Sequence, residues 1–169
     1  MATRFDFESI YSDKEWVVNY PNAQGYQEKF LNMCREVISK TDFPNLDLEI
    51  EEYKSGGILF NKESTPMLAV SFKKSNFKKL GIFFRAQAFG NVVYYTLMHT
   101  VDRGFWDSAK GRSHAEVLAT IRGKCKNWAQ WEELQSLNAL GSLVFSKSMD
   151  ALDPDYMKNR QLMQVAAGT

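Results

Sequence analysis

The dipeptide Gly90-Asn91 constrains the fold of this chain more than any other feature of its sequence. It separates two segments rich in β-branched and aromatic residues, 80–88 and 92–101. A Gly-Asn pair between two such segments is a strong signal for a two-residue β-hairpin turn. The sequence therefore predicts two adjacent antiparallel strands after its midpoint.

The predicted turn also fixes the register of the hairpin, because the pairing follows from counting outward from the two turn residues. Phe84 then faces Leu97, and Arg85 faces Thr96. Successive side chains of a strand point to opposite faces. One face is apolar and suits a core under helices; it consists of Ile82, Phe84, Ala86, Val93, Tyr95 and Leu97. The other, which we call the outer face, is mixed and consists of Phe83, Arg85, Gln87, Tyr94, Thr96 and Met98.

A helix and three more strands are predicted before the hairpin. Apolar residues three and four apart indicate an amphipathic helix at 22–40, with its first residue, an asparagine, as N-cap. Strict alternation of aliphatic residues and carboxylates indicates a half-buried strand at 46–51. Short apolar segments at 58–60 and 67–73 indicate two more strands. The apolar residues among 1–21 do not recur at a regular spacing, and we expect this segment to form an arm packed on the domain.

Helix signals follow the hairpin. A capping-box pattern at 113–116 begins one helix. Apolar positions continue through 128–145, either in the same helix or in a separate one, since Gly123 and Asn127 weaken the junction. Asp153-Pro154 predicts the start of a final helix that runs to about residue 165, with frayed residues at 166–169. Strands and helices are thus segregated along the chain, which favours an α+β fold. We expect a single domain, 1–169, with an N-terminal helix, an antiparallel meander of about five strands, and two or three C-terminal helices packed on the sheet.

The charge balance and the cysteines indicate which partners and which cell compartment to expect. Lysine plus arginine number 21 and aspartate plus glutamate number 20, so no overall field attracts nucleic acid or anionic lipid. No basic segment leads into an apolar run and no long apolar stretch occurs, so we expect no signal peptide and no contact with a membrane. Cys34 and Cys125 fall on predicted helix stripes, and no Asn-x-Ser/Thr acceptor is present. These features favour the cytoplasm.

The candidates for catalysis are few, because histidine occurs only at positions 99 and 114. His99 is predicted near the end of a strand, on the core side, three residues before Asp102. A histidine beside a carboxylate is able to act as acid or base, and Arg85 or Arg103 would hold an anion. The simpler interpretation is a hydrogen-bonded histidine at the core margin. The sequence shows no phosphate-loop, dinucleotide or nucleophile-elbow motif and no zinc-ligand spacing, so we predict no cofactor and no metal.

One loop combines lysines with a phenylalanine. Its cations are Lys73, Lys74, Lys78 and Lys79, and Phe77 lies among them. An exposed ring between cations suits phosphate contact with base stacking. Lysines at a hairpin end also keep a protein soluble and discourage edge pairing. We therefore expect only weak binding of nucleic acid by this loop.

The leading hypothesis is a non-catalytic, intracellular protein-binding module. The outer face has the composition of an interface core or a ligand pocket, unless helices cover it as well. Trp106, Trp128 and Trp131 are close enough in sequence to form a further patch, and tryptophan is enriched among binding hot spots. Accessory and inhibitor proteins of toxin–antitoxin or phage–host conflict often have this profile. The alternative is a small enzyme that acts on a phosphate-bearing or nucleic-acid substrate with His99 and Asp102.

Overall fold

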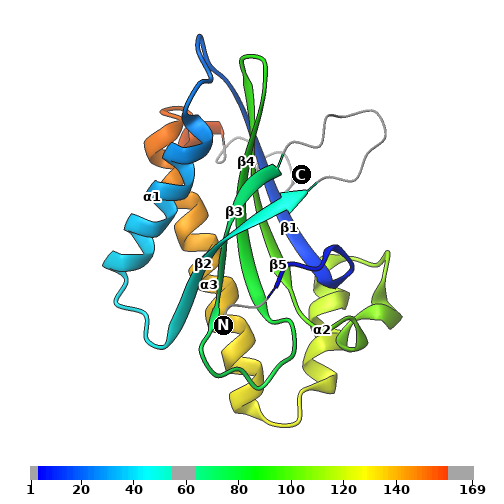
Figure 1. The fold of residues 1–169 in the computed structure, drawn as a ribbon. Helices are drawn as coiled ribbons and strands as arrows, with labels where there is room; N and C mark the ends of the chain where they lie inside the picture. Colours follow the sequence, from blue (N-terminus) through cyan, green and yellow to red (C-terminus); the bar gives the residue numbers. More distant parts are fainter. Residues whose placement is uncertain (1–3, 55–63, 160–169) are drawn as a thin grey trace.

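The computed structural model describes residues 4–54 and 64–159, and it confirms the predicted α+β class (Figure 1). Its strands form one antiparallel sheet and are β1 (Ile10–Asn19), β2 (Leu46–Lys54), β3 (Ser64–Phe72), β4 (Gly81–Phe89) and β5 (Val92–Thr100). The helices are α1 (Tyr26–Lys40), α2 (His114–Lys124) and α3 (Trp128–Leu152). Three short 3-10 helices accompany them: η1 (Phe7–Ser9), η2 (Arg103–Phe105) and η3 (Asp107–Ala109).

The predicted hairpin lies at the centre of the sheet, whose strand order is β1-β5-β4-β3-β2. Its register is confirmed, because Arg85 pairs with Thr96 as the turn position requires. Gly90 has a φ of 61°, in the left-handed region that glycine adopts without steric cost. The turn residues therefore set the pairing of both strands.

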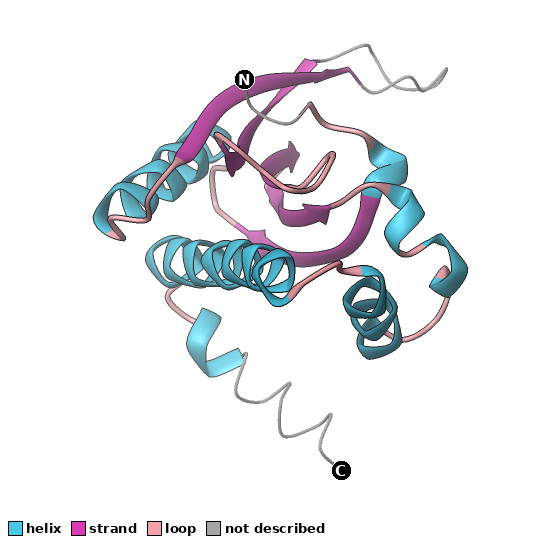
Figure 2. Cartoon of the chain, turned by 90° about the horizontal axis from the view of Figure 1, so that it is seen from below, coloured by secondary structure: helices cyan, strands magenta, loops and turns pink. Residues whose placement is uncertain are grey.

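Helices α1 and α3 pack on one face of the curved sheet and form the main core with it (Figure 2). Helix α1 contributes Phe30, whose ring centroid lies 4.9 Å from that of Tyr95 on β5. The hairpin residues predicted to face this core are all buried in it: Ile82, Phe84, Ala86, Val93, Tyr95 and Leu97. The period of two along each strand therefore predicted the core side correctly.

Ten residues of the segment predicted as a packed arm form strand β1 instead, and this strand pairs with β5 along its length. A register shift between Ile10 and Ser12 interrupts the alternation at the start of this strand. Beyond the shift, Asp13 and Glu15 point to the outer face and Trp16 points toward the helices. Because one face of this edge strand is exposed to solvent, its sequence shows only a weak alternation of apolar and polar residues. The missing signal explains why the strand was not predicted.

Two other boundaries differ from the prediction. Helix α1 begins at Tyr26, because the Asn22 side chain accepts a hydrogen bond from the Gln24 amide in a turn of its own and Gly25 is the N-cap. The strand predicted at 58–60 lies outside the described residues. The meander of β2, β3, β4 and β5 is otherwise as expected, and β1 completes the sheet.

The predicted capping box is present at the start of α2. The Ser113 hydroxyl accepts from the Glu116 amide, and the Glu116 carboxylate accepts from the Ser113 amide at 3.0 Å. Helix α3 follows as a separate helix, and of the predicted final helix the structure describes the residues up to 159. Segments η2, η3 and α2 gather at one end of the sheet (Figure 1).

Candidate binding site

The outer face carries a row of residues that runs across four strands. Glu15 pairs with Thr96, Thr96 with Arg85, and Arg85 with Met67. Paired residues of antiparallel strands project from the same face. The neighbouring row consists of Asp13, Met98, Phe83 and Ala69. The predicted group of outer-face residues is thus extended by two carboxylates from the unpredicted strand β1.

N-terminal residues close part of this face, where none of the described α-helices covers it. The Phe5 ring centroid lies 5.0 Å from that of Phe83 and 5.4 Å from that of Tyr53. The Phe5 amide donates to a Glu51 carboxylate oxygen at 2.9 Å and holds the segment down on β2. Phe83 is fully buried as a result, so it supports a small second core with Met67 and Met98 and is not available to a ligand.

The remaining part of the outer face contains a pocket of about 490 Å³, within the size range of small-ligand sites. The sheet contributes Asp13, Glu15, Arg85, Thr96 and Met98 to its lining. The other lining residues come from η1, the start of β1 and the segment around η2 and η3: Phe7, Glu8, Ile10, Arg103, Trp106 and Lys110. Buried Met98 and Trp106 form its apolar base, while Phe7, at 71% exposure, stands at its edge. The pocket is therefore amphipathic.

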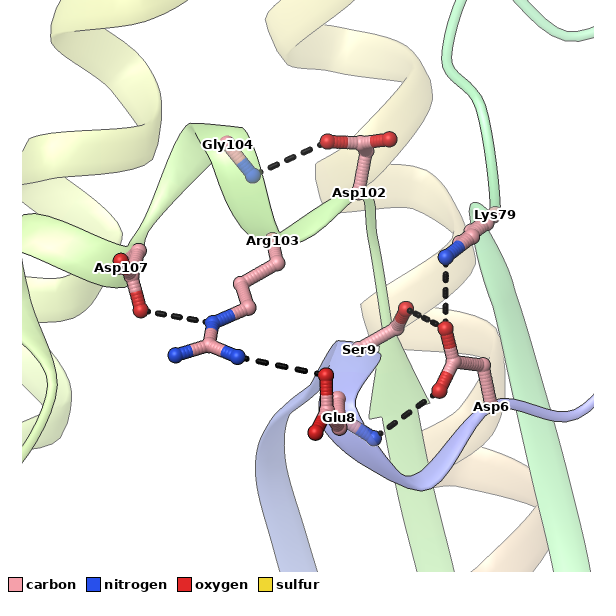
Figure 3. A network of polar contacts seen from close by, with 8 residues as sticks. All are labelled: Asp6, Glu8, Ser9, Lys79, Asp102, Arg103, Gly104 and Asp107. Carbon is pink, nitrogen blue, oxygen red and sulfur yellow. Dashed lines mark hydrogen bonds and ion pairs between the residues drawn. The ribbon is translucent and has the colours of Figure 1, made fainter.

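A polar network fixes the position of η1 beside the pocket (Figure 3). Arg103 binds Asp107 at 2.7 Å and Glu8 at 3.2 Å, and so links η1 to the η2–η3 segment. Asp6 accepts from Lys79 at 2.6 Å and caps η1 through the Glu8 amide, and its hydrogen bond from Lys79 lowers the pKa of the Asp6 carboxyl. These exposed contacts are individually weak, but together they attach η1 at two points.

Arg85 lies half-buried at the pocket. One terminal nitrogen donates to Gln87 on the same strand, and the guanidinium carbon lies 5.4 Å from the Tyr53 ring centroid. The buried Nε atom has no hydrogen-bond partner, and the guanidinium forms no ion pair with any described residue. Burial lowers the pKa of Arg85 from its ordinary value, which reflects the cost of desolvating the cation.

The three tryptophans predicted as a patch lie in two places. Trp106 lines the pocket with 7% exposure, and its buried Nε1 has no partner in the described chain. Trp128 is 60% exposed on α3, where Arg122 of α2 lies over it and over Trp131, at 5.5 and 5.8 Å from the ring centroids. Trp106 therefore belongs with the outer face, while Trp128 and Trp131 form a separate surface.

The residues of the enzymatic alternative do not form a hydrogen-bonded group. His99 is 4% exposed and faces α3, and neither ring nitrogen completes a hydrogen bond, although the Ser12 and Asn138 backbones lie near. Burial, and secondarily the Lys14 charge, lowers the pKa of His99 to about 4. The Asp102 side chain instead caps η2 by accepting from the Gly104 amide at 2.9 Å.

The aromatic residue of the lysine loop is buried, contrary to the prediction of an exposed ring. Phe77 packs edge-on against Phe105, with ring centroids 5.0 Å apart. Lys79 is engaged by Asp6, while Lys73 and Lys74 are exposed. The ring was placed wrongly because a single phenylalanine between polar residues carries no period that shows which way it points. Base stacking on this ring is thereby excluded.

Searches for related proteins give no family assignment. No family model, curated protein or solved structure matches the chain. Within residues 4–54 and 64–159, no group of three histidine, cysteine or acidic side chains is arranged to hold a metal ion. In the same residues, no helix is both long and apolar enough to cross a membrane.

Six residues that line the pocket were not predicted as site residues from the sequence: Phe7, Glu8, Ile10, Asp13, Glu15 and Lys110. Asp13 and Glu15 alternate with Lys14 and Trp16, a period of two that is visible but short. Phe7 and Lys110 carry no local signal, because their position depends on how η1 and η3 fold back beside the sheet. The pocket is thus a product of tertiary structure.

Proposed function

We propose that this protein is a non-catalytic binding module whose partner, another protein, docks on the outer face over the pocket. The observation that carries the proposal is the half-buried guanidinium of Arg85, which has no ion-pair partner among the described residues. A desolvated cation without a counter-charge is unfavourable in the free protein. An acceptor group supplied by a partner would compensate it, and arginine is enriched in such binding hot spots.

The apolar lining supports the same proposal. Phe7 exposes an aromatic ring at the pocket edge, and Met98 and Trp106 lie at its base. Interface centres combine aromatic, methionine and arginine side chains in this way, surrounded by charged residues. Asp13, Glu15 and Lys110 provide the charged surroundings here.

The placement of the reactive side chains supports a role without catalysis. Cys34 and Tyr11 are buried under α3, and burial raises the pKa of the Cys34 thiol to about 12 and also raises the pKa of Tyr11. His99 is buried beside Gly141. A nucleophile or general base needs access to substrate and a pKa near the working pH. We also place the binding in the cytoplasm, and the free thiols of Cys34 and Cys125 are consistent with this.

The replacement Arg85→Met tests whether Arg85 serves binding or folding. Methionine keeps an apolar side chain of similar length and removes the uncompensated charge, so the free energy of unfolding in urea should change by less than about 1 kcal/mol. Capture of proteins from a lysate of the source cells should lose at least one specific partner in this variant. Arg35→Met, on the exposed surface of α1, is the matched control and should keep that partner.

The captured protein is then purified and titrated directly against the wild type and both variants. Loss of affinity only in Arg85→Met, by about 1 to 3 kcal/mol, is the expected result. Destabilisation of Arg85→Met by more than about 2 kcal/mol would make Arg85 a structural residue. Equal affinity of all three proteins would reject the pocket as the docking site.

A further inference from the structure

We infer that the pocket recognises an extended segment of the partner in which a carboxylate residue, bound by Arg85, lies two positions from a lysine or arginine, bound by Glu15 and Asp13. This inference rests on the proposed function and specifies the chemistry of the partner. It draws on three observations: the balance of charges around the pocket, the spacing of those charges across the sheet, and the exposed aromatic edge.

The balance of charges favours a carboxylate over a phosphate. The pocket is lined by three carboxylates, from Glu8, Asp13 and Glu15, and by three cationic side chains. One of those cations, Arg103, already binds Glu8 and Asp107. The pocket therefore has no excess of positive charge for a phosphate dianion. A singly charged carboxylate matches the planar guanidinium of Arg85, which is able to donate two parallel hydrogen bonds.

The spacing of the charges favours a ligand that carries both signs. Glu15 and Arg85 lie in one cross-strand row, separated by Thr96 on the strand between them. Two strand spacings place their backbones about 9.6 Å apart. In an extended peptide, residues i and i+2 point to the same side about 7 Å apart, and flexible lysine and glutamate side chains bridge the difference. The Thr96 hydroxyl lies between the two charged positions.

The exposed aromatic edge favours a segment of a protein over a free ion. The Phe7 ring is exposed to water, which solvates an apolar ring poorly. This ring and Met98 at the bottom of the pocket offer apolar contact to the side chains that flank the charged pair of a peptide. A small inorganic anion would leave these apolar atoms uncovered. A peptide with aromatic residues beside its charges would cover them.

Capped pentapeptides test the inference on the full-length protein. The reference peptide is acetyl-Phe-Lys-Ala-Glu-Phe-amide. Three others replace its glutamate by glutamine, its glutamate by phosphoserine, or its lysine by glutamine. Binding is followed by NMR of ¹⁵N-labelled protein through the Thr96 amide and the Trp106 indole N–H. We expect the reference peptide to bind with the lowest Kd and each single replacement to weaken it about fivefold to tenfold.

Protein variants assign each charge of the peptide to its partner. Arg85→Met should no longer distinguish the glutamate peptide from its glutamine form. The double variant Asp13→Asn, Glu15→Gln should no longer distinguish the lysine peptide from its glutamine form. Arg35→Met should behave as the wild type. The NMR spectrum of each free variant verifies that it is folded, so a lost response reports on binding.

Several outcomes would overturn the inference. Tighter, Arg85-dependent binding of the phosphoserine peptide would replace the carboxylate by a phosphate while leaving docking at this pocket intact. Concentration-dependent dimerisation of the free protein that Arg85→Met abolishes would identify a second copy of the chain as the occupant. If no peptide perturbs the pocket signals up to about 5 mM, where binding is worth only about 3 kcal/mol, the inference is rejected. The proposed function is tested separately, by the affinity of the captured partner for the wild type and the variants.

Discussion

Burial lowers the pKa of two polar side chains of the central hairpin, but only one of them loses its charge near pH 7. Arg85 retains its charge in the pocket, because the pKa of a guanidinium stays far above neutrality even when desolvation lowers it. His99 lies in the core under α3 and is neutral near pH 7, since its pKa is lowered to about 4. The first keeps its charge at the pocket, and the second links the stability of the folded state to pH.

We predict that His99 makes stability fall in mildly acidic solution. Its pKa of about 4 in the folded state lies below the ordinary 6.5, so the unfolded chain takes up the proton first. The contribution is fully present above pH 6.5 and is lost as the pH falls from there to about 4. The loss amounts to about 3 kcal/mol by linkage. Urea unfolding at a series of pH values measures it.

The two histidines provide a matched comparison. His99→Gln should flatten the pH dependence of the unfolding free energy between pH 6.5 and 4. His114→Gln, at the exposed start of α2, removes only a secondary charge effect on His99 and should leave most of the dependence in place. If His99→Gln shows the same slope as the wild type, the acid sensitivity comes from other groups.

At the level of elements, close approach of α3 to the sheet depends on a glycine. A Cβ atom at Gly141 would lie 3.1 Å from Nε2 of His99 and 3.3 Å from two carbons of Ile82. Both neighbours are buried on adjacent strands of the sheet, so they have little room to move. The absence of a side chain at this position sets the distance between helix and sheet.

We predict that Gly141→Ala destabilises the protein by about 1 to 2 kcal/mol, because overpacking against His99 and Ile82 outweighs the gain in helix propensity. Gly123→Ala in α2 is the control, since nothing lies within 4 Å of its Cβ position. That substitution should stabilise by about 0.5 to 1 kcal/mol. Thermal and urea unfolding distinguish the pair. A stabilised Gly141→Ala variant would show that the sheet yields to α3.

For the whole molecule, the decisive arrangement is the unequal covering of the two faces of the sheet. Helices α1 and α3 cover one face completely enough to bury the hairpin side chains there (Figure 2). The other face is covered by a short N-terminal segment through Phe5, and beyond it the pocket stays open. The same segment then presents Phe7 to solvent at the pocket edge, so within three residues it changes from covering the sheet to lining the pocket.

We predict that Phe5→Ala and Phe7→Ala separate these two roles. Phe5→Ala uncovers Phe83 and should lower the free energy of unfolding by about 2 kcal/mol, less than for a fully buried ring because Phe5 is half-buried. Phe7→Ala should change it by less than about 0.5 kcal/mol and weaken the reference pentapeptide several-fold. Urea unfolding and the NMR titration measure both. Equal stability losses in the two variants would contradict this division.

The sequence by itself determined the α+β class, the register of the β4–β5 hairpin and the start of α2. These features depend on local rules: a two-residue turn sets a register, alternation sets a face, and a capping box begins a helix. The outer-face position of Arg85 opposite Thr96 follows from the same rules.

Tertiary structure alone decided that β1 joins β5 across about eighty residues of chain and that Phe5 covers Phe83. It also placed Arg85, which has no ion-pair partner among the described residues, in a pocket built from η1, β1, the hairpin and the η2–η3 segment. Such contacts form between segments that are distant in sequence. The periodicity of one segment shows which of its faces is buried but does not specify which other segment packs on that face, because this depends on the packing of the whole chain.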